Sequence, residues 1–232
     1  MGALHVGISP HARRVLTGAV VAALLVSITA CTSIGIDPNS QHMKLLRAGT
    51  TTHLNLVTTL TVPAGMKLLS SSVVDSCGSI TVGSGADGPT HCQIARADVY
   101  SVEVPGDATA NAGVVDALFD SSGFASPTTL VGSPELAQIS AGQKVIASVV
   151  TEVSGIAVRA QFMPAGMPED LLALRLSSLP RHGGTILTSS GDSTATRIET
   201  TRASKAPYIV IIDFSEDYFS STATPAPTPT AK

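Results

Sequence analysis

Catalysis by a serine nucleophile needs a base, and two histidines of this chain are candidates. His182 lies in the turn sequence PRHGG, and His91 lies directly before Cys92. Either imidazole could serve if a serine and a carboxylate converge on it in the fold. The chain has no G-x-S-x-G sequence, so no strand–turn–helix that presents a nucleophile is indicated. A surface histidine in a turn is the favoured interpretation of His182, and we predict no catalytic residue.

Two other motifs lack the context that their chemistry requires. The segment 83–88 matches G-x-G-x-x-G, but Pro89 follows where the dinucleotide fold needs a helix, which favours a flexible loop. Gly191-Asp192-Ser193 is similar to the start of the GDS-type esterase motif. That family places the motif just after an N-terminal strand and adds a late Asp-x-x-His, and neither feature occurs here.

Acidic side chains offer little for metal binding. Asp213, Glu216 and Asp217 lack the glycine and the alternation of a calcium loop, and are predicted to be solvated charges at a strand end. His91-Cys92 fits no zinc spacing, and the other histidines of the exported region are scattered. We therefore predict no metal site and no cofactor.

The first thirty residues have the plan of an export signal. Arg13 and Arg14 precede Val15–Ala30, a stretch without charge. As a helix this stretch spans about 24 Å, less than the roughly 30 Å of a bilayer core. The longer uncharged run Val15–Ile36 would reach about 33 Å, so an uncleaved signal anchor is the alternative.

Cys31 decides between these readings. It follows Ile28, Thr29 and Ala30, a branched aliphatic residue and two small ones, and the four together resemble the bacterial lipobox. The resemblance implies that the Cys31 sulfur receives diacylglycerol and that the signal peptide, residues 1–30, is cut between Ala30 and Cys31. A thiol is a far better nucleophile near neutral pH than a hydroxyl would be.

The lipid would fix the compartment. One acyl chain binds a membrane marginally, whereas two chains at about 0.8 kcal/mol per CH₂ hold durably. The basic leader stays inside, so residues after Asp37 face the extracytoplasmic side whether the leader is cleaved or kept. Arg13-Arg14 matches the twin-arginine signal only in part, and leaves the general secretory route open.

The low charge and the Ala, Thr and Val content, together with the lipobox, resemble cell-envelope lipoproteins of mycobacteria and related actinobacteria. That resemblance covers the export signal closely and implies membrane attachment. It implies no activity, because we recognise no characterised activity of that group in the residues of this chain.

The two remaining cysteines, Cys77 and Cys92, would lie in an oxidising compartment, and a disulfide is predicted. The bridge would close a glycine-rich loop of about 15 residues and contribute about 3 kcal/mol.

Composition limits the partners. Hydrophobic residues make up 44% of the 232, and there is no Trp, so the core must be aliphatic and sugar-stacking platforms are few. Net charge is −3, and −5 without the leader, with no basic cluster, which disfavours nucleic-acid binding. Expected ligands are a lipid, a cell-wall component or a protein.

The chain after the leader divides into three parts. Residues 31–50 are predicted to be the lipidated cysteine and a polar tether, 51–219 a folded domain, and 220–232 a disordered Thr/Pro-rich tail that could carry sugar. Strands are indicated by the alternation over residues 54–62 and 97–104, by a hairpin around Ser154-Gly155, and by the apolar run 206–214, a central strand.

Two helices have clear end signals. The first has Asp107 or Thr109 as its N-cap and ends at Gly123. The second begins near Pro168, with Glu169 and Asp170 in its positive first turn. The fold class is therefore α+β: a mainly antiparallel sheet with two to four short helices on one face.

An internal echo joins "VPAGMKLLSSS" (from Val62) to "MPAGMPEDLLALRLSS" (from Met163), and "GSITVGSG" (from Gly78) to "GTILTSSG" (from Gly184). It indicates either a duplicated strand–helix–strand unit or chance similarity in an Ala/Gly/Ser-rich chain. The function predicted is a membrane-anchored lipoprotein with a non-enzymatic binding or structural module. The alternatives are an envelope serine hydrolase using His182 or His91, and a single-pass, signal-anchored protein.

Overall fold

The computed structural model describes residues 37–79, 90–124, 126–177 and 185–221. Two compact units, 1–40 and 41–232, divide the chain. The first is described only over its last residues, where the Ser40 amide donates to the Asp37 carbonyl and the Asn39 amide to the Asp37 carboxylate. All elements below belong to the second unit.

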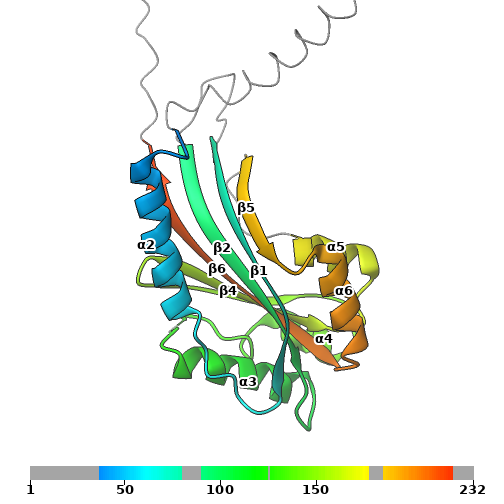
Figure 1. Ribbon diagram of the computed structural model, residues 1–232. Coiled ribbons are helices and arrows are strands. Elements are labelled where there is room, and N and C mark those ends of the chain that lie inside the picture. The colour runs from blue at the N-terminus through cyan, green and yellow to red at the C-terminus, as the bar shows by residue number, and fades with distance from the viewer. Residues whose placement is uncertain (1–36, 80–89, 125, 178–184, 222–232) are drawn as a thin grey trace, which may run out of the picture. The chain divides into compact units, whose positions relative to one another are not determined.

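The predicted α+β class with an antiparallel sheet is confirmed. Six strands pair in the order β3-β4-β6-β2-β1-β5, and every adjacent pair is antiparallel. The sheet crosses the whole domain in Figure 1, with β6 at its centre, as the apolar run 206–214 predicted. The strands are β1 (Met66–Ser79), β2 (Thr90–Val102), β3 (Ala147–Val153), β4 (Ile156–Pro164), β5 (Thr185–Gly191) and β6 (Tyr208–Ser220).

The hairpin between β3 and β4 is also confirmed. Its two turn residues, Ser154 and Gly155, have φ angles of 53° and 83°. Two consecutive positive φ angles are those of the tight turn that matches the twist of antiparallel strands. Val153 therefore pairs directly with Ile156.

Five helices occur in the described residues, one more than the upper end of the prediction. Both helices that were predicted from their end signals are confirmed: Asp107 caps α3, and α5 begins directly after Pro168. Gly123 follows the end of α3 with a φ of 74°. The helices are α2 (Gln41–Val57), α3 (Ala108–Ser121), α4 (Pro134–Ser140), α5 (Glu169–Ser177) and α6 (Thr194–Ala203).

Helix α2 overturns two predictions. Its segment was expected to be a tether up to residue 50 and then a strand, because Leu54, Leu56 and Leu60 alternate. Instead Met43, Thr50 and Leu54 are buried along one side of a helix. These positions follow the helical period of 3.6 residues, which outweighs a short alternation. The folded domain therefore begins near Gln41.

The helices cover both faces of the sheet, and the expectation of one face was wrong. Adjacent residues of a strand point to opposite faces. On β2, Arg96 donates to Thr58, just after α2, whereas the next residue, Ala97, packs with Leu172 of α5. The continuous apolar run of β6 has this cause, because a strand buried on both faces has no polar side.

The internal echo is not a structural repeat. In the first copy, residues after Pro63 form strand β1, which starts at Met66. In the second copy, residues after Pro164 lead into helix α5. The paired leucines that looked alike in sequence therefore lie in different secondary structures, and a duplicated strand–helix–strand unit is excluded.

Candidate functional site

Several predicted site residues lie outside the described residues. They are Ala30 and Cys31 of the lipobox, His182, and the glycine-rich segment 83–88. Cleavage and lipidation at Ala30-Cys31 therefore stay predictions. No helix in the described ranges is long and apolar enough to cross a membrane.

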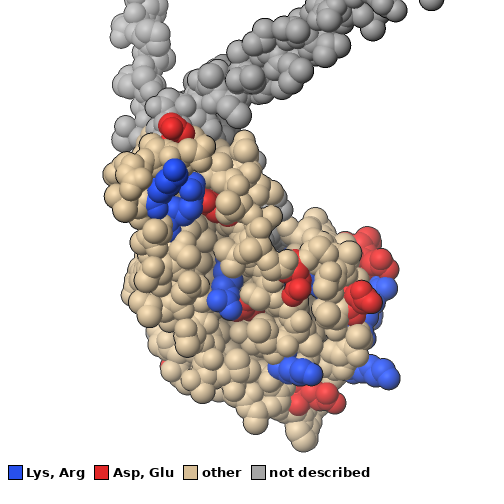
Figure 2. All heavy atoms as spheres, in the orientation of Figure 1, with Lys and Arg blue, Asp and Glu red and all other residues tan. Residues whose placement is uncertain are grey.

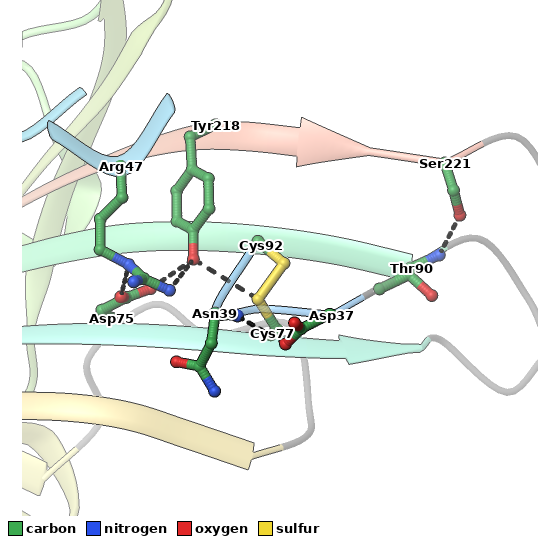
Figure 3. The surroundings of a disulfide bond; sticks show 9 residues. All are labelled: Asp37, Asn39, Arg47, Asp75, Cys77, Thr90, Cys92, Tyr218 and Ser221. Atoms are coloured by element: carbon green, nitrogen blue, oxygen red, sulfur yellow. Dashed lines mark hydrogen bonds and ion pairs between the residues drawn. A yellow bond between two sulfur atoms is a disulfide. The ribbon is translucent and has the colours of Figure 1, made fainter. Parts of the chain in front are cut away.

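The predicted disulfide is present. Cys77 and Cys92 lie opposite each other on β1 and β2, and their sulfur atoms are 2.00 Å apart. The Tyr218 hydroxyl from β6 lies 3.4 Å from the Cys77 sulfur and donates to Asp75 over 2.7 Å (Figure 3). Arg47 of α2 forms an ion pair with the same Asp75 carboxylate. This cluster joins α2 to three strands and has a structural role.

The Tyr218 hydroxyl should make the stability of the folded domain fall at alkaline pH. Burial, and the hydrogen bond to Asp75, raise the pKa of Tyr218 to about 12, above the usual 10. Tyr218 therefore holds its proton more tightly in the folded state than in the unfolded state. Its contribution to the free energy of unfolding is fully present below pH 10 and is lost as the pH rises towards 12. We expect urea unfolding midpoints to decline over that range, and Tyr218→Phe to decline less steeply. An equal slope in both proteins would contradict this assignment.

The three carboxylates of β6 were predicted to be solvated charges at a strand end, and the structure contradicts this for Asp213, which lies inside the strand and is buried. Asp217, near the end of β6, is exposed. Asp213 is 2% exposed and accepts from Arg159 at 2.7 and 2.9 Å and from Gln161 at 3.0 Å. Glu216 pairs with His53 at 3.1 Å. In the part of the chain that the structure describes, no three His, Cys, Asp or Glu side chains are placed to hold a metal ion.

His91 has a carboxylate neighbour. Its Nδ1 atom lies 3.7 Å from Asp217, which also accepts from Gln93 at 3.1 Å. The structure thus brings an imidazole and an acid together at the end of the sheet. The Asp217 side chain is 41% exposed, and an ordinary surface ion pair accounts for this geometry.

Gly191-Asp192-Ser193 has a structural explanation. A Cβ on Gly191 would lie 2.3 Å from the Ser71 carbonyl oxygen, and its φ is 92°, so only glycine fits. Asp192 accepts from the Ser71 amide at 3.2 Å, while Ser193 caps α6 by accepting from the Thr196 amide. The serine therefore organises a helix end.

The most distinctive feature is a groove between strands β1 and β5 and helices α5 and α6, which we call the Arg197 groove. Its volume is about 310 Å³. Hydroxyl groups are the most numerous polar groups of its lining, Asp192 adds a carboxylate, and Val73, Val74, Leu176 and Ile186 add apolar surface. The hydroxyl-bearing residues are Ser72, Ser177, Ser189, Ser190, Ser193 and Thr194.

Arg197 lines this groove from α6 and is only 3% exposed. Its Nη1 donates to the Leu176 carbonyl at the end of α5. Its Nε and Nη2 have no hydrogen-bond partner within the described residues. Burial lowers the pKa of Arg197, opposed by Asp213, Asp192 and Asp98. A buried guanidinium with two unmet donors costs free energy that a fold rarely leaves uncompensated.

Further buried polar atoms of β1 and α6 also have no partner within the described residues. The hydroxyls of Ser70, Ser72 and Ser76 on β1, and of Thr201 on α6, are buried without partners among the described residues. On β1 these serines alternate with residues of the opposite face and share the side of Val74, which packs with α5. Sequence analysis missed this set, because α6 has no hydrophobic periodicity and only pairing of β1 with β5 assembles it.

A second hollow of about 490 Å³ lies where α2, α3 and β3 end. Its lining combines the apolar side chains Leu56, Leu60, Phe124 and Val153 with threonine and serine hydroxyls. Its hydrogen-bond donors are serine and threonine hydroxyls and backbone amides, and no charged side chain is among its described lining residues.

The fold and the Arg197 groove define a class: an α+β domain with one antiparallel sheet between two helical layers. Comparison with known proteins finds no matching family model, no similar curated protein and no similar solved structure.

Proposed function

We propose that this protein is an envelope lipoprotein, tethered through lipid on Cys31, whose domain is a non-enzymatic module that binds a small polar ligand on the extracytoplasmic side. The leader and the residues Ile28 to Cys31 support the anchor. The Cys77–Cys92 disulfide supports an oxidising compartment, because such bonds persist outside the cytoplasm.

One observation carries the binding role: Arg197 is buried in a groove with two donors unmet. A ligand that accepts from these donors would recover the free energy of leaving them unpaired. The serine-rich lining favours a polar ligand over an acyl chain, which needs an apolar cavity. The face drawn in Figure 2 is largely uncharged, with Lys and Arg interspersed with Asp and Glu, and it shows no broad patch of one charge.

A serine hydrolase is the second candidate. Its one supporting observation is that His91 lies near Asp217, with 3.7 Å between Nδ1 and the carboxylate, a distance that must shorten before the acid could orient the imidazole. A fluorophosphonate probe that labels a serine of the purified protein would favour it over the binding module. A single-pass signal anchor is the alternative to the lipid.

Replacing Cys31 by alanine should abolish lipidation and leave the leader uncut. Intact-mass spectrometry of the membrane fraction should find the wild-type chain beginning at residue 31 with a diacylglyceryl mass, and the variant beginning at Met1 without it. Cys77→Ala with Cys92→Ala is the matched control, since it removes thiols but spares the lipobox. A wild-type chain with an unmodified Cys31 would overturn the anchor.

A further inference from the structure

We propose that the Arg197 groove binds the oxyanion of a small hydroxylated acid, a carboxylate or a phosphate monoester, through Nε and Nη2 of Arg197. The inference rests on the proposed binding function and names its ligand class. These two nitrogen atoms have no hydrogen-bond partner within the described residues.

The donor pair of Arg197 has the geometry of a fork. Nη1 is occupied by the Leu176 carbonyl, which leaves Nε and Nη2. The N–H bonds of Nε and Nη2 lie in one plane and run parallel on the same edge of the guanidinium. Two oxygen atoms of a carboxylate or phosphate accept from such an edge together, and a neutral carbonyl or hydroxyl offers only one.

Within the described residues no carboxylate forms an ion pair with Arg197, although Asp192 lines the same groove. Each carboxylate that acts on it is already hydrogen-bonded elsewhere: Asp213 to Arg159, Asp98 to Arg96, and Asp192 to the amide of Ser71. Arg96 and Arg159 thus offset two of the three acids. Nε and Nη2 are themselves buried from solvent, so an oxyanion would reach them only after the side chain of Arg197 moves towards the groove. It would then complete the pairing of Arg197 in a region of low dielectric, where the attraction is strong.

The start of α6 adds to this preference. Ser193 and Thr194, the N-cap and first residue of α6, line the groove that Arg197 enters from the same helix. A helix N-terminus carries partial positive charge and favours anions. Here it coincides with a buried arginine whose donors are unmet, and the two observations indicate the same ligand charge.

The rest of the lining indicates a hydroxylated body. Ser72, on β1, has a buried hydroxyl with no partner in the described chain, and Ser189 and Ser190 on β5 form the exposed side of the groove. Hydroxyl groups of a sugar can donate to and accept from serine alike. A volume of about 310 Å³ suits a ligand of monosaccharide size, at the lower end of small-molecule sites.

The test is calorimetric titration of the full lipoprotein in neutral detergent with glucuronate, glucose 6-phosphate and glucose. At least one acid should bind, and glucose about tenfold or more weakly. The stronger of the two acids identifies the oxyanion. Arg197→Lys keeps the charge but loses the fork, and should weaken binding about tenfold or more. The matched control is Arg202→Lys, an exposed arginine of the same helix, with affinity changed less than about twofold.

A direct readout covers the case in which Arg197→Lys does not fold. In the wild-type protein, the Arg197 Nε–H resonance should shift when the acid is added and stay in place with glucose. The proposal is overturned if neither acid binds, if glucose binds as well as the acids, if Arg197→Lys folds and binds normally, or if this resonance does not move. Because the purified protein is titrated, these results are independent of the mass measurement on Cys31.

Discussion

Replacing Arg159 by methionine should lower the free energy of unfolding by about 3 kcal/mol at neutral pH. The cause is Asp213, which is almost fully buried and would lose both of its arginine hydrogen bonds while keeping only Gln161. We take the lower end of the range for a broken buried pair because Arg159 itself is 36% exposed. Urea unfolding followed by circular dichroism measures the effect.

The pH dependence and a double variant identify the mechanism. Burial already raises the pKa of Asp213, and removing Arg159 raises it further. Since a raised pKa makes the folded state prefer the proton, the penalty should shrink as the pH is lowered. Asp213→Asn added to Arg159→Met should recover stability. Arg202→Met breaks the exposed pair with Glu169 and should cost less than about 0.5 kcal/mol. An equal cost for Arg159 and Arg202 would refute the argument.

Local signals predicted the parts of the fold that local interactions determine. Asp107 accepts from the Thr109 and Ala110 amides, so residues close together in the sequence determine the cap of α3. The turn at Ser154-Gly155 is equally local. Helix α2 was missed because its threonines and alternating leucines suit a strand in isolation. In the helix Met43, Thr50 and Leu54 are buried at helical spacing, but the sequence does not show that these residues, rather than the alternating leucines, face the core.

The same distinction explains what could be predicted of the site. The two cysteines were predicted to pair from their number and compartment alone, and they do. Asp213 was taken for a solvated charge because its partners, Arg159 and Gln161, lie more than fifty positions away on β4. Nothing in the sequence around Arg197 indicated a binding residue. Its two distinguishing features are burial by elements distant in the sequence and two donors without partners in the described residues. Both depend on which strands and helices meet.

Breaking the disulfide is the second large effect. Cys77→Ser with Cys92→Ser should lower the free energy of unfolding by about 3 kcal/mol, because the bridge closes a loop of 15 residues. The loss should come mainly from the unfolded chain, which gains freedom, so the folded domain should keep its circular dichroism spectrum. Without the bridge, the backbone pairing of β1 with β2, which extends from the cysteines to Met66 and Val102, still holds the two strands in register.

Reduction of the wild type provides the control for this prediction. A thiol reductant should reproduce the loss in the wild-type protein and have no effect on the double variant, since no bond remains to be reduced. Tyr218 makes the result specific, because its hydroxyl touches the Cys77 sulfur and binds Asp75. If the bridge also positions this cluster, the double variant should lose part of the alkaline slope assigned to Tyr218. An unchanged slope with a full 3 kcal/mol loss would assign the entire contribution to loop closure.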